Sequence, residues 1–140
     1  MAASPNAERT GGATGHETTL RERHEVALDV QQSIFGASAA EDPDAWPAEA
    51  ALKALWTDVC FGDSWARPGL DRRTKSMVTI AMLLARGAST TLIRHHVEGG
   101  LGLGITRDEM AELFIHATAY CGAPATAGTW SSVRDLMDEP

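Results

Sequence analysis

The chain has 140 residues, which is the length of one domain, and its hydrophobic share of 44% is ordinary for a globular protein. The formal net charge of −7 argues against nucleic acid as a partner, because phosphate binding needs clustered Lys and Arg. No apolar run approaches the length of a membrane-spanning helix, so we expect no membrane partner.

Residues 1–18 are mostly small or polar and show no periodic apolar pattern. This predicts a disordered N-terminal tail, followed by one domain over residues 19–140. Thr19 and Glu22 have the spacing of a capping box, so the first helix is expected to begin there. Its apolar residues recur at helical spacing, and Gly36 is expected to end it. The predicted buried face consists of Ala27, Val30 and Ile34.

A connector rich in Asp, Glu, Pro and Ala occupies residues 39–47, and Pro47 suits the first turn of a second helix. We expect the apolar stripe of this helix to lie in the core. The stripe is Leu52, Leu55, Trp56 and Val59. A turn is predicted over residues 62–71, and Asp71 is a good N-cap for the next helix.

Residues 77–85 are apolar on nearly every side, which is typical of a helix buried all round, so we expect this helix to be the central one. The following helix is expected to be capped by Ser89 or Thr90 and to carry His95 and His96. It ends in a cluster of glycines over residues 99–104. Such a cluster indicates close packing of backbones or space left for a ligand.

A second capping box, Thr106 with Glu109, opens another helix, and Gly122 is expected to end it. Its apolar stripe is Met110, Leu113, Phe114 and Ala117. Pro124 is expected to start the last helix, whose inward residues are Trp130, Val133 and Met137. No segment alternates as a strand does, so the predicted class is all-α with about six helices.

The two cysteines, Cys60 and Cys121, stand far apart and form no C-x-x-C pair. Neither a disulfide framework nor a zinc site is indicated, and we expect both thiols to be reduced and packed in helices. The first residues lack the basic and apolar regions of a secretory signal, so we expect a cytoplasmic protein.

Four cations lie within nine positions: Arg67, Arg72, Arg73 and Lys75. One interpretation is a carboxylate clamp, because a guanidinium grips a carboxylate through two parallel donors. The other is a solvated helix start with salt bridges to Asp63 and Asp71. Cations at a helix N-terminus oppose the helix dipole, which favours a reason beyond the helix itself.

His95 and His96 are adjacent, so we expect them to point to different sides of their helix. Glu112 and His116 are four apart on their helix and can hydrogen-bond. The pair could make His116 a usable proton carrier, or it could be only an exposed surface pair. Tyr120 could donate to a substrate oxygen, although core packing is the preferred interpretation. Trp65 is the best candidate for a pocket wall.

The run C-F-G-D-S-W-A-R-P-G-L-D-R-R-T-K-S at residues 60–76 is followed by His96, Gly104-Ile105-Thr106 and the segment Y-C-G-A-P at 120–124. This order of motifs resembles the carboxymuconolactone decarboxylase family over roughly residues 20–137. The resemblance implies an all-α fold shared with alkylhydroperoxidase D-like proteins and assembly as trimers or hexamers. It also implies decarboxylation of a small acid or lactone without a metal or organic cofactor.

The family has one His ahead of a Gly/Ala-rich stretch. His96 keeps the family spacing to Gly104, whereas His95 keeps the family spacing back to residues 81–84. The chain therefore has one residue more than the family pattern between these two anchors. We place the extra residue in the turn at 86–89, and His96 is then preferred as the general acid. The resemblance further implies that Arg67 or Arg72 holds the spectator carboxylate of the substrate. An apolar wall such as Trp65 would surround the departing carboxylate.

Redox members of this fold need a C-x-x-C ahead of the His, and residues 89–94 contain no cysteine. Other departures concern the pocket. Phe61-Gly62-Asp63 stands where the decarboxylases have Trp-Gly-Glu, Gly102-Leu103 replaces two Asn, and Glu98 replaces an Arg. Two alternatives therefore stay open. One is a divergent enzyme that isomerises, cyclises or decarboxylates a different acid; the other is a non-catalytic oligomeric binding module.

Overall fold

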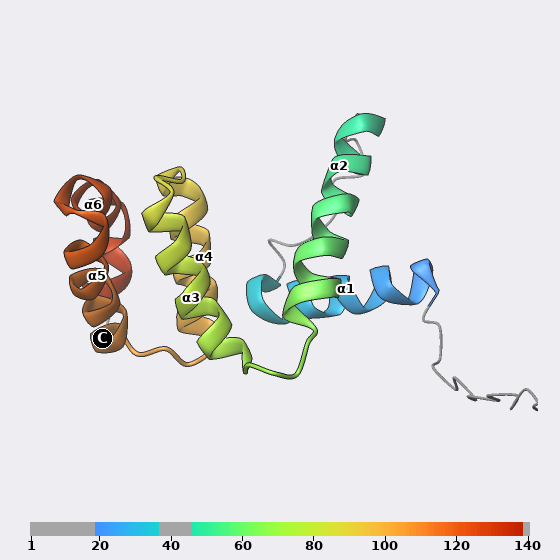
Figure 1. Cartoon of the computed structure of the whole chain (residues 1–140), viewed down its shortest axis with the longest axis horizontal. Helices are drawn as coiled ribbons and strands as arrows, with labels where there is room; N and C mark the ends of the chain where they lie inside the picture. The colour runs from blue at the N-terminus through green and yellow to red at the C-terminus, as the bar shows by residue number, and fades with distance from the viewer. Residues whose placement is uncertain (1–18, 37–45, 139–140) are drawn as a thin grey trace, which may run out of the picture.

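The computed structural model describes residues 19–36 and 46–138, and every regular element within these ranges is a helix. In chain order they are α1 (Leu20–Phe35), α2 (Pro47–Thr57), the π-helix η2 (Asp58–Trp65), α3 (Arg72–Ala85), α4 (Thr90–Gly102), α5 (Arg107–Cys121) and α6 (Ala123–Asp138). The predicted all-α class is confirmed (Figure 1). The predicted tail at 1–18 and most of the connector at 39–47 lie outside the described residues.

Two groups of helices make up the molecule. Helices α3, α4, α5 and α6 pack as a bundle, in which α3 contacts the other three. Helix α1 lies across η2 and also contacts α4, so it joins the bundle to the α2–η2 rod. Figure 1 shows α2 continuing into η2 and its far end standing away from the rest of the described chain. Over the same residues, no helix has the length and apolar character needed to cross a membrane.

Local signals in the sequence set the helix ends. Both predicted capping boxes form: the backbone N–H of Thr19 donates to Glu22 Oε2 at 2.6 Å, and that of Thr106 donates to Glu109 Oε2 at 2.9 Å. Asp71 caps α3 by accepting from a backbone N–H, as predicted. The end of α5 is also confirmed, since its C-cap is a glycine with φ of 82° that a side chain would strain.

The core has two parts that correspond to these two groups. The larger part fills the bundle and contains the α5 stripe predicted from the sequence; its fully buried members include Ile80, Leu84, Ile93, Val97, Met110 and Val133. The smaller part lies between α1 and η2 and consists of Ala27, Val30, Ile34, Phe61 and Trp65. The predicted buried face of the first helix is therefore confirmed.

The predicted turn over residues 62–71 begins later than expected, because the chain stays helical through Trp65. A π-helix has about 4.4 residues per turn, since its hydrogen bonds run from i to i+5, so residues four apart lie almost above one another. Phe61 and Trp65 are four apart, and both are buried against α1. At Gly62 a Cβ would lie 3.3 Å from both Ala27 Cβ and the Arg23 carbonyl, so a glycine lets α1 approach.

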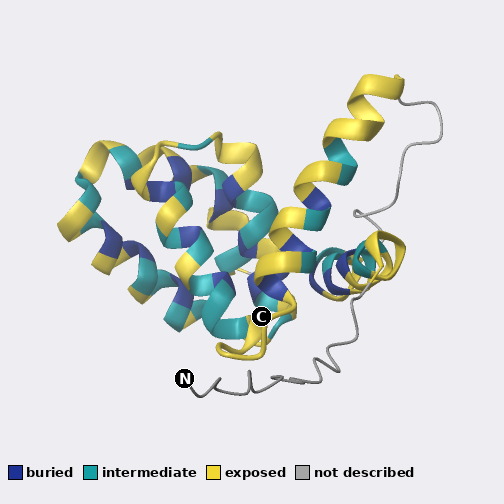
Figure 2. Cartoon of the chain, turned by 45° about the vertical axis from the view of Figure 1, so that its right-hand side comes forward, coloured by how far each residue is buried: buried dark blue, intermediate teal, exposed yellow. Residues whose placement is uncertain are grey.

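Three predictions of burial are wrong for the single chain. The α2 stripe is exposed, with Leu55 61% accessible, because the main packing contacts of α2 within the described chain are those with α1 and η2 (Figure 2). Helix α3 is not buried all round either, since Val78 and Met82 face outward. Cys60 is exposed on the same rod as α2, whereas a packed thiol was expected. These apolar faces have no covering element in the described residues.

Two glycines of α4, Gly99 and Gly100, mark close packing, which is one of the two alternatives that the sequence left open, whereas nothing lies within 4 Å of a Cβ placed on Gly102. A Cβ on Gly100 would lie 2.9 Å from Ser76 Oγ, 3.1 Å from Ile105 Cδ1 and 3.3 Å from Met110 Cε. Real Cβ atoms essentially never approach within 3.0 Å, so Ser76 on α3 sits closer to α4 than any side chain at position 100 would allow, and the Met110 side chain from α5 fills the rest of the space. Gly100 therefore sets how tightly the bundle closes.

We expect Gly100→Ala to destabilise the protein by about 1–3 kcal/mol, because overpacking a filled core forces neighbours to move. Gly128→Ala is the matched control, since it is also a helical glycine and nothing lies within 4 Å of its Cβ position. That change should raise stability by about 0.4–1 kcal/mol through the unfolded state. Urea unfolding of both variants measures the difference, and a Gly100→Ala protein as stable as the control would contradict the packing argument.

Candidate active site

A row of aromatic rings connects α4, α1 and η2. The ring of Phe35, the last residue of α1, stacks on His95 with centroids 4.1 Å apart and meets His96 edge-on at 5.2 Å. On its other side Phe35 meets Phe61 at 5.9 Å, and Phe61 lies 6.1 Å from Trp65. The structure thus brings the two histidines and the predicted pocket wall Trp65 into one aromatic row. Sequence reasoning missed Phe35.

His95 and His96 do not separate as expected. Both are half-buried, both rings contact Phe35, and their centroids are 6.2 Å apart. Burial lowers the pKa of His96 to about 4, and the charge of His95 adds to the effect. His96 is therefore a neutral imidazole near pH 7, able to accept a proton or to donate one once it is recharged.

The segment after η2 is held by Lys75. Its ammonium group donates to the carbonyl of Trp65 at 2.9 Å, and it also contacts the carbonyls of Ser64 and Arg67. Carbonyls at a helix C-terminus carry partial negative charge, so a lysine there satisfies groups that the helix leaves unpaired. Lys75 is thus occupied with the backbone, which leaves it a poor candidate for binding a substrate carboxylate.

Two arginines of the predicted clamp also have protein partners. Arg72 donates to the hydroxyl of Ser33 on α1. Arg73 pairs with Glu109 on α5, and this hydrogen bond lowers the pKa of Glu109 to about 2. The guanidinium of Arg67 has no partner among the residues that the structure describes. Of the four cations, Arg67 is the one without a protein partner over the described residues, while Arg72 donates only to a neutral hydroxyl and keeps its charge.

The alternative salt bridges to Asp63 and Asp71 are not formed. Asp63 instead receives two hydrogen bonds of 2.7 Å from Arg23 on α1. Asp71 accepts from the backbone N–H and the hydroxyl of Thr74, and these bonds lower its pKa. Both carboxylates are therefore used to hold helices, because each finds a donor nearer than the clamp arginines.

Trp65 and Arg67 border two hollows. One of about 480 Å³ opens between the motif segment and the outward face of α3, where Val78 and Met82 line it. The other, about 350 Å³, opens towards α1 and is lined by both Arg67 and Arg72, together with Asp29 and Asp71. His96 does not line either hollow; it is linked to them through the aromatic row.

The predicted α5 residues lie elsewhere on the chain. Glu112, His116 and Tyr120 are all exposed, and Tyr120 is 80% accessible, so the preferred interpretation of core packing is wrong for it. The rings of His116 and Tyr120 are 4.9 Å apart, whereas no hydrogen bond joins Glu112 to His116 among the described side chains. The structure does not bring these three residues together with His96.

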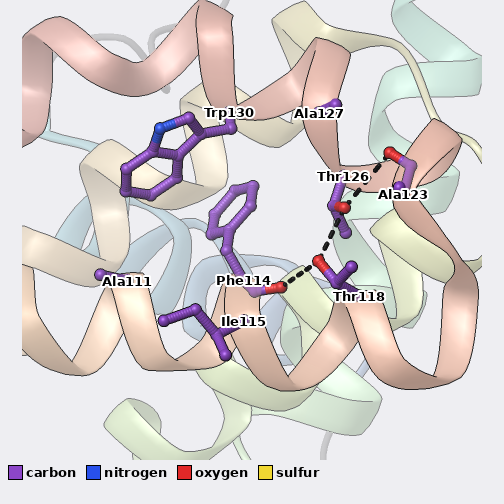
Figure 3. A pocket seen from close by; sticks show the side chains of 8 residues that line it. All are labelled: Ala111, Phe114, Ile115, Thr118, Ala123, Thr126, Ala127 and Trp130. Atoms are coloured by element: carbon purple, nitrogen blue, oxygen red, sulfur yellow. Dashed lines mark hydrogen bonds between the residues drawn. The ribbon is translucent and has the colours of Figure 1, made fainter.

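A third hollow, of about 380 Å³, lies between α5 and α6 and is almost entirely apolar (Figure 3). The hydroxyls of Thr118 and Thr126 are 2.8 Å apart in it, and Thr118 also donates to the Phe114 carbonyl. No cation lines this hollow, so it is a poor site for an acid. Over the described ranges, no three His, Cys, Asp or Glu side chains gather as metal ligands do.

Comparison with known proteins identifies the family. Residues 50–134, more than half of the chain, match the carboxymuconolactone decarboxylase family. The chain belongs to this family. It is 47% identical over 79 residues to the 4-carboxymuconolactone decarboxylase of Acinetobacter baylyi, a match that spans 56% of this chain and 58% of that protein. The sequence resemblance is therefore confirmed.

A second family relative spans more of the chain. The nitrosuccinic acid decarboxylase npaB of Metarhizium robertsii is 29% identical over 125 residues, which cover 85% of this chain and 87% of that protein. An uncharacterised 15.0 kDa protein of Paracoccus denitrificans is 32% identical over 75 residues, or 53% of this chain and 56% of its own. The two relatives with a named activity are both decarboxylases.

The low pKa of His96 has a consequence for stability. As the pH falls from 6.5 towards 4, the unfolded chain protonates this residue while the native protein does not, so the free energy of unfolding falls with the pH. His96→Gln removes this contribution. We expect wild type to lose more stability than His96→Gln between about pH 7 and pH 5 in urea unfolding. His116→Gln, at an exposed position, should follow wild type; equal losses in all three proteins would contradict the burial of His96.

Proposed function

We propose that the protein is a decarboxylase of a small carboxylic acid, a carbon–carbon lyase that needs no metal or organic cofactor. One observation carries the proposal: a half-buried, neutral His96 belongs to the same aromatic row as Trp65, which borders the unpaired Arg67. A proton carrier, an apolar wall and a free cation are the groups that such a reaction requires. The names of two family relatives support the same reaction class.

The substrate must offer a place for the electrons of the broken bond. When carbon dioxide leaves, the electron pair of the carbon–carbon bond stays on the substrate, and it needs an electron-accepting group nearby. The names of the two relatives include a lactone in one and a nitro group in the other. A lactone carbonyl reached through a double bond would give a dienolate, and a nitro group would give a nitronate. Either anion is then protonated on carbon.

Each residue has a place in this sequence of events. Arg67 binds a carboxylate that stays on the substrate, through two parallel hydrogen bonds. Trp65 keeps water from the carboxylate that departs, and poor solvation favours a step in which that charge is lost. His96 then gives the proton to carbon. Arg72 and His95 are proposed as further substrate-binding residues, Arg72 through the hollow it shares with Arg67.

Proton donation requires His96 to be charged, although its pKa in the free protein is about 4. An anionic substrate beside the ring would raise this pKa, because an opposite charge favours the imidazolium form. Substrate binding and proton loading are therefore coupled in this mechanism. A neutral His96 in the empty site also avoids repulsion between two adjacent imidazolium groups, His95 and His96.

A nitro acid is the second candidate substrate class. The nitrosuccinic acid decarboxylase matches over 85% of this chain, whereas the 4-carboxymuconolactone decarboxylase matches over 56%. The departures at Glu98, Gly102 and Leu103 remove a cation and two amides from the family pattern, which favours a changed substrate. Isomerisation or cyclisation by the same groups, or binding without turnover, would be the remaining alternatives.

We expect His96→Gln to lower carbon dioxide release about 10²–10⁴-fold, the usual contribution of a general acid. Arg67→Gln should raise KM about tenfold or more, because a hydrogen bond to a charged group contributes about 1.5–3 kcal/mol. The control for Arg67→Gln is Arg86→Gln, which removes the same charge at an exposed position at the end of α3. Product is followed by mass spectrometry with 4-carboxymuconolactone and with nitrosuccinic acid.

The outcomes separate the alternatives. Full turnover by His96→Gln would overturn its role as the acid. Release from nitrosuccinic acid alone would select the second substrate class. Saturable binding of either acid by wild type, without any product, would indicate a binding module.

The protein is also proposed to be a cytoplasmic homo-oligomer, a trimer or hexamer as the family resemblance implies. The uncovered apolar faces of α2 and α3 support assembly, since contiguous exposed apolar surface marks interaction sites. We propose that Glu112, His116 and Tyr120 take part in the reaction from a neighbouring copy. In an oligomer, these α5 side chains could reach the active site of the adjacent subunit. Within one chain they are separate from His96.

Leu55→Glu is expected to lower the oligomeric state, because it places a charge in the middle of the exposed α2 stripe. Sedimentation velocity measures the change in mass. Leu20→Glu is the control, since Leu20 is also an exposed leucine but lies at the start of α1. An unchanged sedimentation coefficient in Leu55→Glu would place the contact between copies elsewhere.

A further inference from the structure

Phe35 contacts both histidines of α4 and also an aromatic residue of η2. It ends α1, and its ring contacts both histidines of α4 from above. The plane of Phe35 is 20° from that of His95, a stacked pair, and 86° from that of His96, an edge-to-face pair. The Phe35 ring also makes an edge-to-face contact with Phe61 on η2, at 87°.

Helix α4 is shaped to receive this ring. Gly99 follows His96 by three positions and His95 by four, so the three residues share one face of the helix. A Cβ on Gly99 would lie 2.9 Å from Phe35 Cε1, closer than real Cβ atoms come, and 3.0 Å from both Phe35 Cδ1 and Ile34 Cγ2. The missing side chain of Gly99 therefore provides the space in which the Phe35 ring lies.

These contacts act on His96 in two ways. An edge-to-face neighbour limits the rotation of the imidazole, and it occupies volume that water would otherwise fill. Burial is the larger cause of the low pKa of His96, and the charge of His95 is the smaller. The other elements packed against α4 are α1, α3 and α6, and over the described residues none of them brings a charged group that shifts this pKa.

We propose that Phe35 is a positioning residue for His96, whose ring fixes the direction of the imidazole and keeps water from one side of it. This role rests on the proposed function, in which His96 gives the proton. Phe35 acts through the histidine and does not touch the reacting atoms. The contact between α1 and α4 then keeps the His96 imidazole weakly basic in the absence of substrate. His96 takes up its proton when the substrate anion binds.

The first test is Phe35→Leu, which keeps an apolar side chain but removes the ring. We expect the His96 pKa, followed by NMR titration without substrate, to rise from about 4 towards 6.5. With substrate, kcat should fall while KM changes little, and the pH dependence of kcat/KM, which reports groups of the free enzyme, should move with the pKa. Phe35→Tyr keeps the ring and should retain the wild-type pKa and kcat.

Gly99→Ala provides a second, independent test, because the added methyl group pushes the Phe35 ring away without changing it. It should shift the His96 pKa in the same direction as Phe35→Leu. The double variant should shift it no further than one change alone, since both act through the same ring. Gly128→Ala, in open space on α6, should leave the pKa and kcat unchanged. If Phe35→Leu fails to fold, Gly99→Ala and Phe35→Tyr still decide the question.

A folded Phe35→Leu or Gly99→Ala protein in which the His96 pKa stays at about 4 overturns the proposal. A shift that is fully additive in the double variant overturns it as well. Failure of the proposed function looks different: His96→Gln then turns over normally, and the role of Phe35 in catalysis fails with it. Lower thermal stability alone, with an unchanged pKa and kcat, would show that Phe35 is only a packing residue.

Discussion

The approach of α1 to its two neighbours is the contact on which the candidate site depends. Two glycines permit it: Gly62 on η2, where a Cβ would lie 3.3 Å from Ala27, and Gly99 on α4, which leaves room for Phe35. Pairs between Arg23 and Asp63 hold the same helix in place. A side chain at Gly99 would force the Phe35 ring to shift, and one at Gly62 would need α1 to give way by a few tenths of an ångström.

Charge pairing then decides which cation can meet a substrate. The chain carries a net charge of −7, yet two carboxylates of the motif segment are already bound, Asp63 to Arg23 on α1 and Asp71 to the helix cap of α3. Arg73 pairs with Glu109, and the ammonium group of Lys75 donates to backbone carbonyls. Because these partners are satisfied, one guanidinium, that of Arg67, stays available within the described chain. An acidic protein can thus keep a local site for an anion.

Large apolar side chains are exposed on two helices outside the bundle core. The bundle core is closed, but α2 and the outward face of α3 expose large apolar residues, among them Met82 at 60% accessible. Burying such groups contributes about 25 cal/mol per Å² of apolar surface, so leaving them in water is costly. Assembly with further copies would recover this energy. It would also enclose the hollow that Trp65, Arg67 and Met82 line.

Much of the fold could be predicted from the sequence, because its signals are local. The capping boxes at Thr19 and Thr106 and the α5 stripe depend on residues within one or two turns of each other, and all were confirmed. The motif run over residues 60–76 likewise identified the family and with it the candidate residues.

The tertiary structure decided what depends on residues far apart in the chain. Sequence reasoning assigned His95 and His96 to different sides of their helix, but Phe35, sixty positions before His95 in the sequence, contacts both rings. It placed a turn at Gly62, whereas burial of aromatic side chains against α1 extends the helix as a π-helix. Helix periodicity shows that a face is apolar, and only packing shows whether another element covers it. For that reason the sequence alone determined the helices and the family, and the tertiary contacts determined the state of His96 and the availability of Arg67.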